Sequence, residues 1–270
     1  MRAPVQRRCL VYQTGCMTQV PAAERTIAIL RHLAQRHRPV PAASVARALG
    51  LPRSTTYHLL AALERGGLVA AYPAQRTWGL GIASFELGQA YLRQIPLERI
   101  ARPIVRALAL EAGETAHLAV LHGNEVLYLV KEDAVSATPL VTDVGVRLPA
   151  HLTATGRAML AVMSEAQVRA LFAPRRPLVD RTGRGPRDVR SLLATLESER
   201  VQGWSVERGH VSDDIASGAV ALRPRAPAAA PIAAVGVSVW EPKLNGPAVP
   251  SLVGAVRRAV AALEAALNSS

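Results

Sequence analysis

The sequence predicts an α+β protein of two domains, a small helical domain with a β-hairpin followed by a larger domain of mixed strands and helices. Apolar residues recur at helical spacing up to about residue 65, and short strand-like runs follow them. Beyond residue 113, strands and helices mix without repeated βαβ units. The charge is also divided unevenly, with a formal +9 in residues 1–82 and +3 in residues 83–270.

This uneven charge predicts a local basic surface. Residues 1–82 contain 11 arginines against Glu24 and Glu64. A coding bias explains why arginine replaces lysine throughout the chain, but it does not explain why the excess lies at one end. A phosphate-binding surface is local in this way, whereas charge that serves solubility is diffuse.

Several protein classes are disfavoured by composition. No run approaches the roughly 18 apolar residues of a membrane span, so we expect no membrane partner and a cytoplasmic location. Cys9 and Cys16 are the only cysteines, and they cannot complete a tetrahedral metal site. We expect no metal and no cofactor.

Residues 1–19 lack periodicity and are predicted to be a disordered leader, with Met17 as an alternative start.

Three helices are predicted in the N-terminal domain, residues 20–82. The first spans 24–35 and the second spans 42–49, with Gly50 suited to the left-handed conformation after a helix. The third begins near Pro52 and stops at Gly66-Gly67. Two short helices joined by a tight turn form a helix-turn-helix, whose second helix enters a DNA major groove.

The exposed face at the start of that third helix carries the predicted DNA contacts. They are Arg53, Ser54, Thr55, Thr56 and His58. Arginine pairs with guanine edges or phosphate, hydroxyls donate to phosphate, and a threonine methyl contacts thymine. The alternative for Ser54 and Thr55 is that they cap the helix. Residues 68–72 and 77–80 are predicted to form a hairpin wing that presents Gln75 and Arg76, while Trp78 is assigned to the core.

These segments resemble the IclR family of bacterial transcription factors. The runs "ERTIAILRHLA", "ASVARALGLPRSTTYHLLAALERGGLV" and "RTWGLG" follow the order of its winged helix-turn-helix domain over about residues 20–95. The chain departs from the family at His58, where arginine is usual, and at Gly79, where a larger residue is frequent.

A linker helix is predicted over residues 83–96, and the larger domain over residues 97–270. Within it we expect a helix over 97–112, two strands joined around Gly123-Asn124, and an amphipathic helix after "HLTATGRAML". A helix over 186–200, further strands, a Pro/Ala-rich turn at 224–231 and a terminal helix over 250–267 follow. The start of the "ATGRAML" helix suits a carboxylate ligand, with His151 adding a hydrogen bond. The alternative is that the threonines there cap the helix.

The same resemblance extends over Glu114–Leu267 and implies a GAF-like α/β effector-binding domain. Carried over by matching motif, the effector site comprises residues of four motifs: Ala154, Thr155, Glu207, Ser217, Gly236 and Ser238. Where Glu207 stands the family often has aspartate, and where Gly236 stands it often has serine. Asp214, which replaces a glycine, is expected to add negative charge near the site.

The expected function is sequence-specific DNA binding by a transcriptional regulator, with repression favoured, under the control of a small-molecule effector such as a carboxylate or an aromatic catabolite. Double-stranded operator DNA and a second copy of the chain, as a homodimer or tetramer, are the expected partners. An enzyme is the main alternative, but H-E-x-x-H and G-x-S-x-G are both absent, and no catalytic residue is assigned. The other alternative is a winged helix that binds RNA or protein.

Overall fold

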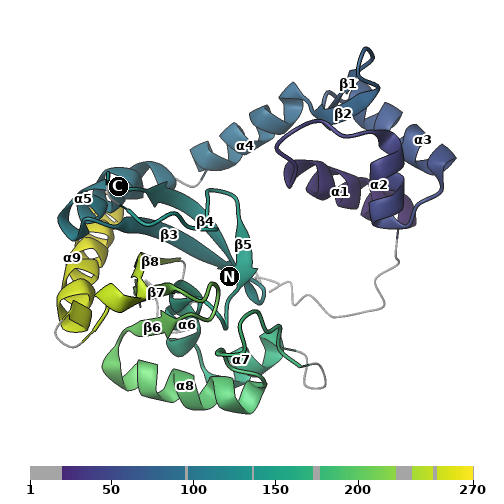
Figure 1. The fold of residues 1–270 in the computed structure, drawn as a ribbon. Coiled ribbons are helices and arrows are strands. Elements are labelled where there is room, and N and C mark those ends of the chain that lie inside the picture. Colours follow the sequence, from purple (N-terminus) through teal and green to yellow (C-terminus); the bar gives the residue numbers. More distant parts are fainter. Residues whose placement is uncertain are drawn as a thin grey trace, which may run out of the picture. The chain divides into compact units, whose positions relative to one another are not determined.

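A computed structural model describes residues 20–94, 97–135, 137–172, 177–222, 233–245 and 248–269 (Figure 1). The predicted leader, both cysteines and the turn at 224–231 lie outside these residues. Contacts within the chain divide it into two compact units, one ending at Gln94 and the other beginning at Ile95. Each unit is described by itself.

The N-terminal unit contains the three predicted helices and the hairpin. Its elements are α1 (Pro21–Ala34), α2 (Ala42–Leu49), α3 (Arg53–Arg65), β1 (Val69–Tyr72), β2 (Thr77–Leu80) and α4 (Ile82–Gln94). β1 and β2 pair antiparallel, with Tyr72 opposite Thr77. The turn between α2 and α3 contains Gly50 at φ 64°, the left-handed conformation expected of it.

A small apolar core fixes α3 against the other two helices. Ile29 of α1, Val45 of α2, and Leu60 of α3 are fully buried in it. Trp78 packs against this core, and its backbone forms a bridge with Val40, which confirms its assignment to packing. Leu60 is buried on one side of α3, so the opposite side of the helix, including that side of its first turn, faces solvent.

The linker helix α4 begins directly after the hairpin. Ser84 donates a hydrogen bond to the carbonyl of Leu68, so its first turn is tied to the N-terminal unit. Its side chains Ile82, Phe85 and Leu87 are all more than half exposed.

The C-terminal unit is built on a six-stranded antiparallel sheet. Its order is β5-β4-β3-β8-β7-β6. The strands are β3 (Thr115–His122), β4 (Glu125–Glu132), β5 (Arg147–Pro149), β6 (Ser205–Arg208), β7 (Ile215–Ala221) and β8 (Ala233–Trp240). The sheet joins residues more than a hundred positions apart, since β3 pairs directly with β8.

Helices cover both faces of this sheet (Figure 1). On one face, α5 (Leu97–Ala112) and α9 (Ala248–Asn268) share a core with Leu118, Val235 and Val237. On the other, α6 (Ala154–Ala161), α7 (Glu165–Leu171) and α8 (Val189–Gln202) pack around Tyr128, Ala119 and Ala234. A short 3-10 helix, Glu241–Lys243, follows β8. The α+β class is confirmed.

Three expectations need correction. All eight residues of α6 are buried, so this helix is not amphipathic; it lies between the sheet and α8. The sequence prediction missed α7, which begins with a capping box at Ser164. The predicted helix over 186–200 begins at Val189, because Asp188 accepts a hydrogen bond from Ser191 N and caps it.

None of the helices in the described parts of the chain combines the length and the apolarity that a membrane crossing requires.

Candidate functional site

The first surface of interest is the start of α3. Arg53, Ser54 and His58 are exposed there, and Thr55 is half-buried. Tyr57, which the sequence prediction left out, is also exposed. The sequence signal for these residues is a run of polar positions that lies between the buried apolar positions of one helix.

Thr56 does not belong to this surface. It is fully buried, and its hydroxyl donates a hydrogen bond to the carbonyl of Pro52. It is therefore withdrawn from the predicted DNA contacts, because position 56 lies on the same side of the helix as Leu60 and Leu63.

The capping alternative for Ser54 and Thr55 is also wrong. Pro52 occupies the N-cap position, and no side chain caps α3. The backbone N–H groups of the first turn consequently lack a side-chain cap, and such groups suit a phosphate oxygen. Gln75 and Arg76 lie exposed at the hairpin turn, with Arg76 at φ 52°.

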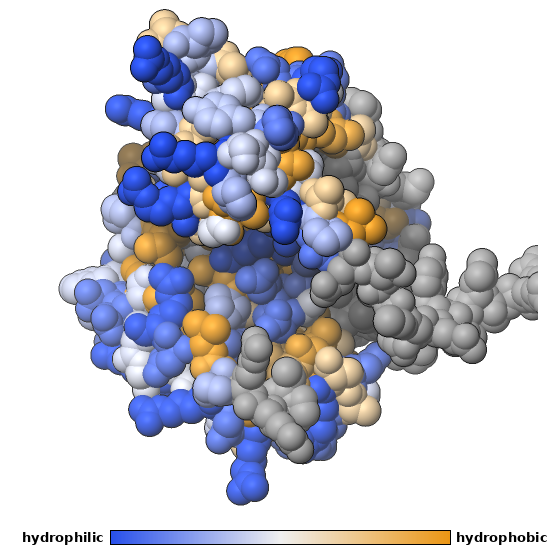
Figure 2. Space-filling model, turned by 90° about the vertical axis from the view of Figure 1, so that its right-hand side faces the viewer, coloured by the Kyte–Doolittle hydropathy of each residue, from blue (hydrophilic) through white to orange (hydrophobic). Residues whose placement is uncertain are grey.

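In Figure 2, apolar side chains are scattered among hydrophilic ones on the face shown. From Val20 to Ile82 the chain contains eight arginines against Glu24 and Glu64. Arg53 is one of the exposed arginines.

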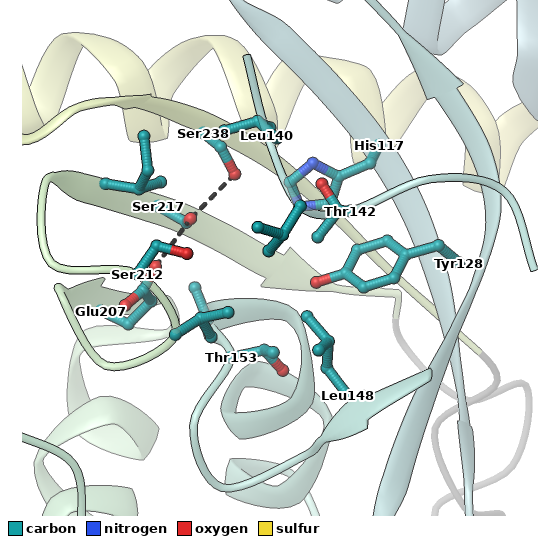
Figure 3. Close-up of a pocket in the computed structure, with 14 residues that line it drawn as sticks. His117, Tyr128, Leu140, Thr142, Leu148, Thr153, Glu207, Ser212, Ser217 and Ser238 are labelled. Carbon is teal, nitrogen blue, oxygen red and sulfur yellow. Dashed lines mark hydrogen bonds between the residues drawn. The ribbon is translucent and has the colours of Figure 1, made fainter. Parts of the chain in front are cut away.

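The second site is a narrow pocket in the C-terminal unit, with a free volume of about 20 Å³ in this structure (Figure 3). It lies between the face of the sheet that α6 covers and the loops after β4 and β6. Its lining comprises His117, Tyr128, Leu140, Val141, Thr142, Leu148, Thr153, Ala154, Glu207, Val211, Ser212, Ile215, Ser217 and Ser238.

Four of the six predicted effector residues line this pocket, namely Ala154, Glu207, Ser217 and Ser238. The sheet register explains why the last three meet. Glu207 on β6 pairs with Ser217 on β7, and Ser217 pairs with Ser238 on β8. Residues directly opposite each other in neighbouring strands point to the same face.

The remaining two do not line it. Thr155 is 1% exposed and lies behind the lining. Gly236 acts by lacking a side chain: a Cβ there would lie 2.9 Å from His117 Nε2 and 3.0 Å from Thr155 Cγ2. It thus makes room for a lining residue. Asp214 is exposed and outside the lining, so its expected charge contribution to the pocket is also corrected.

His117 and Tyr128 are lining residues that the sequence prediction missed. They come from β3 and β4, and their rings meet edge to face with centroids 5.1 Å apart. Figure 3 shows the Tyr128 hydroxyl pointing into the pocket. Burial lowers the pKa of His117 to about 4, so its ring is neutral at pH 7. A polar ring within an otherwise apolar strand is the signal that could have identified each.

Glu207 is the carboxylate of the pocket, and it is 2% exposed. Ser217 Oγ donates to its Oε1 at 2.9 Å, and His210 N donates to its Oε2 at 2.9 Å. Ser217 Oγ also lies 2.8 Å from Ser238 Oγ. Burial raises the pKa of Glu207 to about 7, against the opposing effect of these hydrogen bonds.

A buried arginine holds the loop beside Glu207. Arg157 Nε donates to Glu199 Oε1 at 2.9 Å, and Arg157 Nη1 donates to His210 Nδ1 at 3.0 Å. Burial, followed by the charge of Arg157, lowers the pKa of His210 to about 4. Since His210 N is a donor to Glu207, Arg157 positions the carboxylate through this loop.

At the start of α6 the structure favours the capping interpretation. Thr153 Oγ1 accepts a hydrogen bond from Gly156 N at 3.0 Å. His151 Nε2 lies 2.8 Å from the carbonyl of Val179, so that ring nitrogen is engaged by backbone and not by the pocket.

In the described part of the chain, no three His, Cys, Asp or Glu side chains converge on a metal position.

Two family models match the chain. The model for the C-terminal region of bacterial IclR transcriptional regulators covers residues 89–265, and the IclR helix-turn-helix model covers residues 22–72. The transcriptional repressor AllR of Escherichia coli K12 is 30% identical over 187 residues, which is 69% of each protein. AllR of Salmonella typhimurium LT2 is 30% identical over the same length, 69% of this chain and 68% of that protein.

Solved structures share the fold. An IclR homologue from Microbacterium hydrocarbonoxydans, determined with 4-hydroxybenzoate, superposes with a TM-score of 0.79 at 22% identity, covering 92% of this chain and 100% of that one. The IclR regulator of Alicyclobacillus acidocaldarius gives 0.78 at 24% identity, covering 92% and 99%. With both family models matching in order along its length, the chain belongs to the IclR family of bacterial transcriptional regulators.

Proposed function

We propose that this chain is a repressor that binds operator DNA through the N-terminal unit, and that a small molecule in the pocket of the C-terminal unit changes its affinity for that DNA. One observation carries the proposal: the pocket is lined by buried polar groups, yet it lies in a different unit from the exposed start of α3. Similarity to the AllR repressors supports repression.

The DNA contacts in this proposal are Arg53, Ser54, Thr55, His58, Gln75 and Arg76, with Tyr57 added from the structure. A helix start supplies both a guanidinium for a base edge and backbone N–H groups for phosphate. Recognition by a homodimer predicts two half-sites with approximate two-fold symmetry, separated by about one helical turn of DNA or a multiple of it.

The pocket acts by population shift. A ligand that binds one arrangement of the dimer better than another moves the equilibrium toward that arrangement by the ratio of its two affinities. A coupling of about 1–3 kcal/mol is typical of such regulators and corresponds to a 5- to 150-fold change in DNA affinity.

The test begins by selecting genomic DNA fragments with purified full-length protein. Fluorescence anisotropy then measures binding to a selected fragment, to random duplex DNA, and to RNA of equal length at fixed salt. We expect the selected duplex to bind at least a thousandfold more tightly than random DNA, with steep salt dependence. Equal affinity for all three would overturn the DNA-binding proposal, and preference for RNA would replace it with the alternative partner.

Control by an effector is tested on the same complex. A library of small metabolites is screened by thermal shift, and each hit is titrated into the protein–DNA complex. We expect at least one hit to change operator affinity fivefold or more. Hits that bind without any effect on DNA would contradict the regulatory coupling. The same samples show whether a hit is turned over, which would favour an enzyme.

A further inference from the structure

The pocket of the C-terminal unit has an electrostatic bias that narrows the chemistry of its ligand. Glu207 is its carboxylate, while the described residues that line it include no arginine and no lysine. His117 is buried with a lowered pKa, so its ring supplies no positive charge at pH 7. A carboxylate ligand would therefore face a buried carboxylate in a pocket whose described lining holds no cation.

Two arginines beside the pocket donate their hydrogen bonds to protein groups, and one of them, Arg181, donates to the carbonyl of the lining residue Val211. Arg157 donates to Glu199, to the carbonyls of His151 and Val206, and to His210 Nδ1. Four of its five N–H groups are thereby directed at protein acceptors. The charge of Arg157 still lowers the pKa of Glu207, but burial raises it more, so Arg157 offsets only part of the cost of burying the Glu207 carboxylate.

Two further cations are held by acidic partners. Lys131 Nζ lies 3.3 Å from Asp133 Oδ2, and Arg184 Nη1 lies 3.0 Å from Glu241 Oε2. The start of α6 adds a partial positive charge of roughly 0.5 elementary charge at most. One of its donors, Gly156 N, is already bonded to Thr153. At pH 8, where Glu207 is mostly ionised, this partial charge cannot offset the negative charge of a ligand and that of Glu207 together.

Glu207 retains accepting capacity. Each of its oxygens receives one protein hydrogen bond, from Ser217 and from His210 N, whereas a carboxylate accepts about four. Because Ser217 gives its single proton to Glu207, the proton between Ser217 and Ser238 must come from Ser238. Both Glu207 and Ser238 are left with unused lone pairs.

We propose that the pocket binds a small molecule without a carboxylate, whose N–H or O–H groups donate hydrogen bonds to Glu207, and that it discriminates against carboxylates. This rests on the proposed function of the pocket as the effector site. An amide, a ureide or a polyol has the required chemistry. The rings of His117 and Tyr128, with Leu148, pack against the apolar remainder of such a ligand.

The pocket is tested with matched probe sets that differ in one group. One set is 4-hydroxybenzoate, 4-hydroxybenzamide and 4-hydroxybenzylamine, and a second is lactate, lactamide and 1-amino-2-propanol. Calorimetry and thermal shift at pH 8 measure binding to full-length protein. We expect the amide or the amine of at least one set to bind tenfold or more tightly than its acid. A best binder that is the acid overturns the proposal, as does failure of every probe to bind.

Two variants distinguish the effect of the Glu207 charge on ligand preference from the effect of removing any carboxylate from the protein. In Glu207→Gln we expect the amide-to-acid affinity ratio to fall at least tenfold, because the repulsion of the acid is removed. The control is Glu165→Gln, which makes the same chemical change at an exposed position on α7 and should leave the ratio unchanged. An unchanged ratio in Glu207→Gln contradicts the assignment.

A pH series on wild-type protein tests the discrimination against carboxylates even if Glu207→Gln does not fold. A carboxylate must bind the protonated form of Glu207, so its affinity should rise as pH falls from 8 to 6, while the affinity of the amide should not. Carboxylate affinity that is independent of pH overturns the proposal.

The probes that bind are finally added to the protein–operator complex. Binding of an amide without any change in operator affinity would refute the regulatory role and leave the ligand class intact. Release of the operator by a carboxylate whose affinity does not depend on pH would refute the ligand class and leave the regulatory role intact.

Discussion

The two units place their functional groups in opposite environments. In the N-terminal unit Arg53, Ser54 and His58 are exposed on one helix. In the C-terminal unit Glu207, Ser217 and Ser238 come from three strands and are all less than 10% exposed. A surface that binds a polyanion keeps its charges solvated until binding, whereas a pocket for a small ligand holds its polar groups in a fixed, desolvated arrangement.

This difference affects stability as well as recognition. Exposed arginines on α3 can be replaced with little effect on folding. Each buried polar group of the C-terminal unit depends on its partners, because an orphaned buried charge is strongly destabilising. Variants of the two units should therefore separate into those that change DNA binding and those that change folding.

The largest expected effect is on Arg157. Arg157→Leu leaves Glu199 buried without its cation, and we expect the C-terminal unit to lose about 3–5 kcal/mol of unfolding free energy. Urea unfolding followed by tryptophan fluorescence measures this, with Trp204 and Trp240 reporting on that unit and Trp78 on the other. The Trp78 transition is the internal control and should not move.

The double variant Arg157→Leu/Glu199→Leu sharpens the test. Removing both charges together should restore part of the lost stability, since replacing a buried ion pair by apolar residues is far less damaging than breaking it. A double variant that is no more stable than Arg157→Leu would show that packing, not charge, dominates at this site.

The second effect is a pH dependence at Glu207. Its pKa is about 7 in the folded state, raised by burial above the ordinary value of 4.5. Between pH 4.5 and 7 the folded state binds more protons at this group than the unfolded state, so its contribution destabilises the fold as pH rises. We expect the unfolding free energy of Glu207→Gln, relative to wild type, to rise across this window by up to about 3 kcal/mol.

Titration of His117 and His210 does not obscure this comparison. Both have folded pKa values of about 4, below the ordinary 6.5, so both destabilise the fold as pH falls through the same window. They are present in wild type and in Glu207→Gln, and their contributions cancel in the difference. A flat difference between pH 4.5 and 7 would mean that Glu207 is ionised throughout.

The contrast between the units also explains what could be predicted from sequence. α2, its left-handed Gly50 and the start of α3 follow from local periodicity and local backbone preferences, so their positions were predicted almost to the residue. Within α3, Thr56 departs from the prediction because the exposed segment is not continuous: every third or fourth position of a helix turns inward.

The pocket depends on pairings that local patterns do not contain. His117 lies opposite Gly236 because β3 pairs with β8, a contact between residues more than a hundred positions apart. The resemblance to a family supplied Ala154, Glu207, Ser217 and Ser238, and it also supplied Gly236, whose contribution is space for His117. His117 and Tyr128 stand out as polar rings within apolar strands, but only the pairing of β3 with β4 and β8 places them beside the effector residues.

An intermediate effect is expected at Arg53. Arg53→Ala should weaken binding to the selected operator by about 1–3 kcal/mol, while the stability of the N-terminal unit changes little. Arg65→Ala is the matched control, because Arg65 is an exposed arginine at the other end of α3. Anisotropy with operator and random duplexes measures both. An equal loss on random DNA would make Arg53 a phosphate contact that carries no sequence information.

The smallest effect is expected at Thr56, whose buried hydroxyl donates a hydrogen bond to a backbone carbonyl. Thr56→Val removes the donor to the Pro52 carbonyl but keeps the shape, so we expect about 1 kcal/mol or less of lost stability and unchanged operator affinity. Ser54→Ala, two positions earlier and exposed, should instead leave stability unchanged and weaken operator binding. If Thr56→Val changed the operator preference while the unit stayed folded, the division between exposed DNA contacts and buried supports in α3 would be wrong, and position 56 would have to reach the DNA by a rearrangement of the helix start.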